Sequence, residues 1–296
     1  MVTVPASTLA HYRRFSLYNS PYVAHDRGCA IDLYPEDNRG RSPVAGEVVD
    51  TRTVRGPDRP YAVTEDHLIL IDTGEYVARV LHVEPAVSPG DRVEVGDSLG
   101  EMVRSGFFGQ WVDNHVHLGF RNLDGNPYRA AGSLPVDVDV DVRPLGWDGT
   151  GVVREAGETY VVLDEPRHPN PGAWAGLAAG PGLVLDGGCP HYDGGGVLPG
   201  ADGPVSVAGS RVGVADEEAD HLSDRPVEDE EVSEGAAEAG DGPVEAGEGV
   251  VESTGRGVGL GVDGVASVGR RGGEGLERLD RPLVMKLGTH HLAVHA

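Results

Sequence analysis

Two histidines one residue apart, His115 and His117, lie in a short apolar stretch from Asn114 to Arg121. Side chains of a β-strand alternate between its two faces, so both imidazoles would point to the same side. Two imidazoles at that separation can share one metal ion, or one can bind a metal while the other takes a proton. The alternative is a solvated strand face that carries two histidines by chance, because short motifs are often accidental.

Four other segments carry residues that bear on this choice. Upstream lie 24–35 (AHDRGCAIDLYP) and the strand-like 42–49 (SPVAGEVV). Next come 76–85 (YVARVLHVEP) and the glycine-punctuated 87–100 (VSPGDRVEVGDSLG), followed by the two histidines. This order resembles the lysostaphin-type zinc metallopeptidases, the family of glycyl-glycine endopeptidases and LytM-like proteins, over about residues 16–122. Several segments matched in order are much more specific than a single motif.

The resemblance implies a zinc site and a catalytic pair. Asp32 and His117 would be zinc ligands, and His82 and His115 would be the catalytic histidines. The third ligand would be His25, but the family spaces this histidine four residues from the aspartate, and here the spacing is seven. Either an insertion bulges the loop so that His25 still reaches the metal, or the site has lost a ligand. We expect His25 to bind, because catalytic zinc needs three protein ligands and an open position.

The expected function is therefore that of a zinc-dependent endopeptidase-like hydrolase. Metal-activated water would cleave a peptide bond in a peptide or a peptide-containing polymer. The alternative is a catalytically inactive relative that serves as a binding or scaffolding module, which the irregular spacing before Asp32 favours. The presence of both His82 and His115 favours the enzyme. A third possibility, a lipoyl-like carrier, would require modification of Lys286, which lies far from the glycine-punctuated segment.

The elements that must position these residues are short β-type segments separated by Gly and Pro. No long segment keeps a helical period of 3.6 residues. This pattern predicts a mainly β fold, a lysostaphin-type β-sandwich or open barrel. The expected strands are 42–50, 67–72, 76–82, 92–95 and 115–121.

Changes in composition divide the chain into three parts. Residues 1–132 form the predicted metallopeptidase-like β domain. Residues 133–215 form a smaller β-rich region that opens with the strictly alternating strand 135–142 (PVDVDVDV). Residues 216–296 form an acidic, Gly-rich tail predicted to be disordered, since 216–252 holds fifteen acidic residues against one arginine.

The strongly acidic composition bears on the binding partners of the protein and on the salinity of its source. There are 48 acidic and 24 basic residues, giving a net charge of -24, and Lys286 is the only lysine. Such a surface argues against nucleic acid as a partner and is typical of proteins from halophiles, where salt screens the self-repulsion. No stretch approaches the roughly 20 apolar residues of a membrane span, and no apolar leader follows the N-terminus. We therefore expect a cytoplasmic protein without membrane insertion, while export by another route and the oligomeric state stay open.

Overall fold

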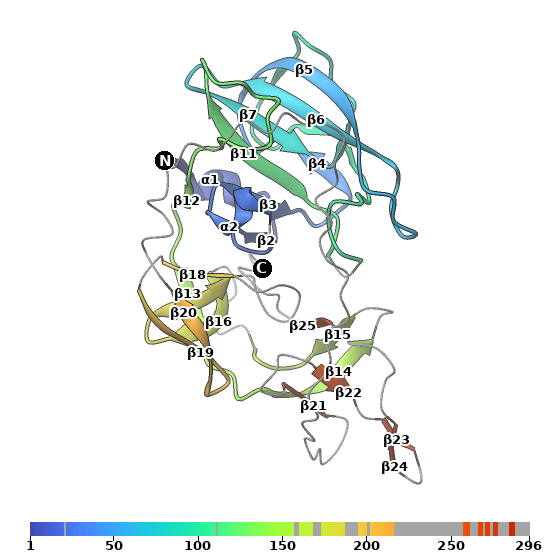
Figure 1. The fold of residues 1–296 in the computed structure, drawn as a ribbon, viewed down its shortest axis with the longest axis vertical. Helices are drawn as coiled ribbons and strands as arrows, with labels where there is room; N and C mark the ends of the chain where they lie inside the picture. The colour runs from blue at the N-terminus through green and yellow to red at the C-terminus, as the bar shows by residue number, and fades with distance from the viewer. Residues whose placement is uncertain are drawn as a thin grey trace. The chain divides into compact units, whose positions relative to one another are not determined.

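The computed structural model describes residues 1–20, 22–110, 112–156, 160–167, 173–186, 195–199 and 202–215, together with five short strands between 257 and 287. These residues divide into two compact units, the first being Met1–Asp141 and the second starting at Val142. Strands dominate both units, so the prediction of a mainly β fold is confirmed. Figure 1 shows the strands of each unit.

The first unit is built on a seven-stranded sheet that curls into a half-barrel (Figure 1). Every neighbouring pair of its strands is antiparallel. In spatial order the strands are β2 (Arg14–Ser16), β3 (Ala30–Tyr34), β11 (Val116–Asn122), β7 (Tyr76–Leu81), β6 (Glu65–Asp72), β5 (Gly46–Arg55) and β9 (Arg92–Val93).

Because side chains alternate along each strand, one face of this sheet is apolar and forms the core, and the other face carries polar side chains. On one face, Leu118 of β11 lies opposite Ile31 of β3 and Val80 of β7, and all three are buried. The neighbouring apolar residues Ile69 and Val116 extend this core face. Because side chains alternate, the intervening residues of the same strands point to the opposite face. That face carries the polar side chains described below.

Packing on the core face can be tested at Leu118, which is 0% exposed. We expect Leu118→Ala to lower the free energy of unfolding by about 2–5 kcal/mol, because it removes buried methyl groups and leaves a cavity. The matched control is Leu123→Ala, whose side chain is 52% exposed and should change stability by about 0.5 kcal/mol or less. Urea unfolding in high salt measures both, and equal losses in the two variants would contradict this assignment of the core.

Smaller elements complete the first unit. A three-stranded antiparallel sheet has the order β4 (Arg39–Arg41), β10 (Ser98–Met102) and β8 (Val83–Pro85). The described residues of this unit also form the short helices α1 (Ala6–Leu9) and α2 (Val23–Asp26) and a parallel pair of β1 (Val2–Val4) with β12 (Val136–Val138). Because β12 pairs with β1, residues 133–141 belong to the first unit, whereas the sequence assigned them to the second region.

Several predicted strands are present with shifted ends. Segment 67–72 lies within β6, segment 76–82 contains β7, and segment 115–121 becomes β11, which begins one residue after His115. The predicted strand 42–50 begins later, at Gly46, and segment 92–95 keeps only two residues as β9. The predicted strand 135–142 is divided between β12 and β13 (Val142–Leu145), and its aspartates at 137, 139 and 141 are exposed as the alternation predicts.

The second unit contains several small sheets. One has the order β13, β16 (Trp174–Gly180), β17 (Leu183–Asp186) and β18 (Gly196–Leu198), and β19 (Gly203–Val207) pairs with β20 (Ser210–Ala215). Another has the order β22 (Ala266–Val268), β21 (Gly257–Leu260), β14 (Thr150–Ala156), β15 (Tyr160–Leu163) and β25 (Val284–Leu287), and β23 (Arg270–Gly272) pairs with β24 (Gly275–Glu277).

Most of the predicted tail, residues 216–296, lies outside the described residues. The exceptions are β21 to β25, where backbone pairing produces strands that the Gly-rich composition did not indicate. Within the part of the chain that the structure describes, no helix combines the length and the apolar character needed to cross a membrane.

Candidate metal centre

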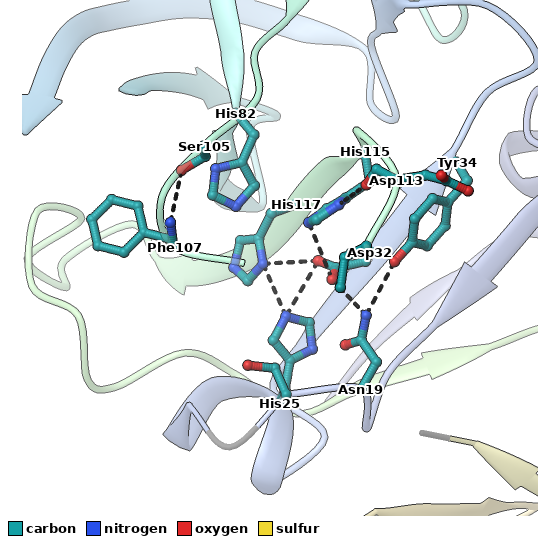
Figure 2. A network of polar contacts seen from close by, with 12 residues as sticks. Asn19, His25, Asp32, Tyr34, His82, Ser105, Phe107, Asp113, His115 and His117 are labelled. Atoms are coloured by element: carbon teal, nitrogen blue, oxygen red, sulfur yellow. Dashed lines mark hydrogen bonds and ion pairs between the residues drawn. The ribbon is translucent and has the colours of Figure 1, made fainter. Parts of the chain in front are cut away.

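Three side chains from separate parts of the first unit converge on one point (Figure 2). His25 Nε2 lies 3.2 Å from Asp32 Oδ1, and His117 Nδ1 lies 3.0 Å from the same oxygen. The two ring nitrogens are themselves 3.0 Å apart. These residues are the group of His, Cys, Asp and Glu side chains, among those described, that is close enough to hold one metal ion.

The shape of this triangle matches one face of a tetrahedral metal site. Ligands about 2.0–2.1 Å from a tetrahedral zinc ion are about 3.3 Å apart, close to the three observed separations. The donor set also fits, since two imidazole nitrogens and one carboxylate oxygen are ordinary zinc ligands. A tetrahedral ion held by these three residues would keep its fourth position open.

The short helix α2 explains how His25 reaches the site despite the long spacing to Asp32. The helix ends at Asp26, and Gly28 then turns the chain with a φ of +61° before β3 begins at Ala30. A side chain at Gly28 would also collide with the ring of Tyr18, so this position suits glycine. The additional residues therefore form a helical turn that points His25 at Asp32, while Asp26 is exposed.

Strand pairing brings the other two ligand candidates together. His117 of β11 lies directly opposite Asp32 of β3 in the antiparallel register, on the face that does not form the core. Directly opposite residues have Cβ atoms about 4.5–5.5 Å apart, which suits two short side chains that share an ion. The register of the sheet thus determines two thirds of the site.

Neighbouring groups hold these ligand candidates in orientation. His25 Nδ1–H donates to the backbone carbonyl of Leu17 at 2.5 Å, which leaves the lone pair on Nε2, the atom that faces Asp32. Asn19 Nδ2 donates to Asp32 Oδ2 at 2.7 Å and to the hydroxyl of Tyr34 at 3.2 Å. A hydrogen bond from the second ring nitrogen to a carbonyl is the usual support for a metal-binding histidine.

Burial and charge shape the protonation of the site. Burial raises the pKa of Asp32, but the neighbouring His115 and His25 and the hydrogen bond with His117 hold it well below its ordinary value. Burial lowers the pKa of His117 to about 3, against an opposing effect from Asp32. The aspartate is therefore ionised and His117 neutral at pH 7, which are the forms that bind a metal.

His115 lies beside the triangle, between two oxygen atoms. Its Nε2 is 3.2 Å from Asp32 Oδ2, and its Nδ1 is 2.8 Å from the backbone oxygen of Asp113. Burial lowers the pKa of His115 to about 4, with Asp32 opposing this shift. Arg14 fixes the loop by an ion pair of 3.0 Å with Asp113 and stacks on the ring of Tyr34. With this lowered pKa, the His115 ring is neutral at pH 7 and carries one N–H, so it donates to one of the two oxygens and has its lone pair on the other nitrogen.

His82 completes the group from the end of β7. Its ring centroid lies 5.1 Å from that of His115 and 5.8 Å from that of His117. The residue is 6% exposed and has a φ of 68°, a left-handed conformation that is uncommon outside glycine. Strain of this kind is often kept at functional sites. The structure thus brings together all five residues that the sequence selected.

A sixth polar residue, Asp66 of β6, was missed by the sequence analysis. Its carboxylate accepts from the Nδ1 of His82 at 2.6 Å and from the hydroxyl of Ser105 at 2.5 Å. Burial raises the pKa of Asp66, but its contacts with His82 and Ser105 outweigh this and lower it. The only signal in the sequence was the pair Glu65 and Asp66 at the start of an apolar strand. Such acidic pairs are common on solvated surfaces.

Two phenylalanines form an apolar wall beside the histidines. Phe108 lies 4.6 Å from the His115 ring and 5.2 Å from the His82 ring, measured between centroids, and Phe107 lies 6.4 Å from His82. The backbone oxygen of Phe108 accepts a hydrogen bond from the hydroxyl of Tyr61 at 3.0 Å. This wall lowers the local exposure to water and thereby strengthens the electrostatic interactions of the site.

Two family models match the chain in sequence. The Domain of unknown function (DUF8155) N-terminal domain matches residues 3–138, and the DUF8155 C-terminal domain matches residues 143–235. Over these two ranges the chain is similar to the two DUF8155 domains. No curated protein matches it. The gap between the two matched ranges coincides with the division between the structural units at 141. The candidate metal centre lies wholly in the range that matches the DUF8155 N-terminal domain.

Proposed function

We propose that the N-terminal domain is a zinc-dependent hydrolase of the lysostaphin-like type that cleaves a peptide bond in a peptide or a peptide-containing polymer. The supporting observation is the triangle of His25, Asp32 and His117 atoms, 3.0–3.2 Å apart, with two further histidine rings beside it. Three protein ligands with one open position distinguish a catalytic zinc site from a structural one, which has four.

Zinc held by this triangle would activate a water molecule and polarise the carbonyl group of the substrate. His82 and His115 would divide the proton transfers, one taking a proton from the water and one delivering a proton to the leaving amine. A ring that has taken up the proton of the water could also donate a hydrogen bond to the oxyanion of the transition state. Phe107 and Phe108 would exclude bulk water from these rings.

The competing function is a binding or scaffolding module with the same fold and no activity. Its main support was the seven-residue spacing between His25 and Asp32. The contact of 3.2 Å between the two side chains removes that support. A module that only binds also has no need for two histidines beside a three-ligand triangle, one of them in a left-handed backbone conformation.

Metal content and hydrolysis test this proposal together. We expect the full chain, reconstituted with zinc in high salt, to hold about one zinc ion per chain, as a single three-ligand site requires. It should cleave members of an oligopeptide panel that includes oligoglycine. A chelator should abolish cleavage and added zinc should restore it. Absence of zinc after reconstitution would contradict the metal site, and full zinc content without cleavage of any peptide would favour the binding module.

A further inference from the structure

Asp66 makes more directed contacts than a structural role for one strand residue requires. The residue is 0% exposed and lies on β6, next to the strand β7 that ends before His82. Oδ1 accepts from the backbone N–H of His67 at 2.6 Å and of His82 at 3.1 Å. Oδ2 accepts from the His82 ring at 2.6 Å and from the Ser105 hydroxyl at 2.5 Å. One carboxylate thus binds both the backbone and the ring of His82.

These contacts determine which nitrogen of His82 carries the proton. An ionised carboxylate can only accept hydrogen bonds, so the ring nitrogen that faces it, Nδ1, must be the donor. The lone pair of a neutral His82 is then on Nε2, and the ring lies next to those of His115 and His117 (Figure 2). The backbone contact of Asp66 with His82 also supports the left-handed conformation that points the ring this way.

We propose that Asp66 is the positioning residue of the site: it holds His82 in the Nδ1–H tautomer, so that Nε2 can accept a proton during hydrolysis. This inference rests on the proposed function for its catalytic consequence, but its structural part can be tested without any substrate. Ser105 supports the same carboxylate oxygen and accepts a hydrogen bond from the backbone N–H of Phe107 at 3.1 Å, so the aspartate also links His82 to the phenylalanine wall.

The decisive variant is Asp66→Asn. If the amide oxygen keeps the two backbone contacts, the amide NH₂ group faces the ring of His82, and the ring must present an acceptor at Nδ1 and carry its proton on Nε2. This is the wrong tautomer for a base. Exchange of a carboxylate for an amide beside a catalytic histidine of a serine protease lowers kcat by about 10⁴-fold while the geometry stays intact.

Nitrogen-15 NMR of the full-length protein with labelled histidines measures the tautomer of His82 directly. The signal that is absent from the spectrum of His82→Asn is assigned to His82. We expect the Nδ1–H tautomer in the wild type, with and without zinc, and the Nε2–H tautomer in Asp66→Asn with unchanged zinc content. Hydrolysis should fall by about 10²–10⁴-fold in kcat with KM nearly unchanged. An Nε2–H tautomer in the wild type would overturn the proposal, whether or not the variant folds.

Two control variants separate this role from simple packing. Asp72→Asn makes the same exchange at the other end of β6, where the carboxylate accepts from the backbone of Gly74, and it should leave the His82 signal unchanged. Ser105→Ala removes a neighbour of Asp66 but keeps the carboxylate, so the Nδ1–H tautomer should persist. A tautomer change in Ser105→Ala as large as in Asp66→Asn would assign the effect to packing and overturn the proposal. If no peptide is cleaved, the NMR result still decides the role of Asp66.

Discussion

Stoichiometric zinc binding should be lost in His117→Ala and in His25→Ala. Each change removes one corner of the triangle and leaves two protein ligands, too few for a stable site. His117 is the stronger test of the sheet register, because it lies directly opposite Asp32. His25 is the stronger test of helix α2, because that helix alone brings it within 3.2 Å of the aspartate. The number of zinc ions per chain in the wild type and in the two variants, measured after dialysis in high salt, tests this prediction.

A second measurement guards against unfolding of the variants. Zinc that binds only the folded protein raises its melting temperature, by an amount that grows with the ratio of free zinc to Kd. We expect this rise in the wild type and in the control His11→Ala, whose side chain is exposed and outside the triangle. Both ligand variants should fold without the rise. Full zinc content in His25→Ala would show that the site uses another third ligand.

His82→Asn and His115→Gln should keep the zinc and lose the hydrolytic activity. Neither residue is part of the triangle, and removal of a general acid or base typically costs about 10²–10⁴-fold in rate. Asparagine is chosen at position 82 because it tolerates the left-handed backbone there better than alanine does. Zinc content and peptide cleavage, measured on the same preparations, test this separation of binding from catalysis.

The two variants are also controls for each other. Because one turnover needs both proton transfers, the loss of either histidine already removes the benefit of the other, so we expect the double variant to be little slower than either single variant, as for residues that act as a unit. Loss of zinc in both variants would instead make His82 and His115 ligands. Unchanged cleavage in both would contradict their assignment as the groups that transfer protons.

The sequence alone was informative wherever a local pattern determines a local geometry. Alternation of apolar residues predicted β6, β7 and β11, because side chains of a strand face opposite sides in turn. The same rule predicted that His115 and His117 face one side, and both reach the Asp32 carboxylate, one at each oxygen. The resemblance to the lysostaphin-type metallopeptidases further implied His25 and His82, which lie more than fifty residues apart in the chain.

Contacts between distant segments could not be predicted in this way. The spacing of His25 and Asp32 left the third ligand candidate open, and only the helical turn of α2 with the left-handed Gly28 decided it. Asp66 had no distinguishing neighbour in the sequence, since its partner His82 is sixteen residues away on the next strand. The end of the first unit depended on the pairing of β12 with β1, which a change in composition at 132 cannot reveal.

The sequence by itself determined the mainly β class and the residue types of the candidate site, because both depend on local periodicity and on side-chain chemistry. The tertiary structure decided which of those residues meet and in what orientation. The register of β3 against β11 brings Asp32 opposite His117, and the contact of β6 with the end of β7 orients His82. Such pairings follow from the free energy of the whole sheet, to which every strand contributes, so no single segment encodes them.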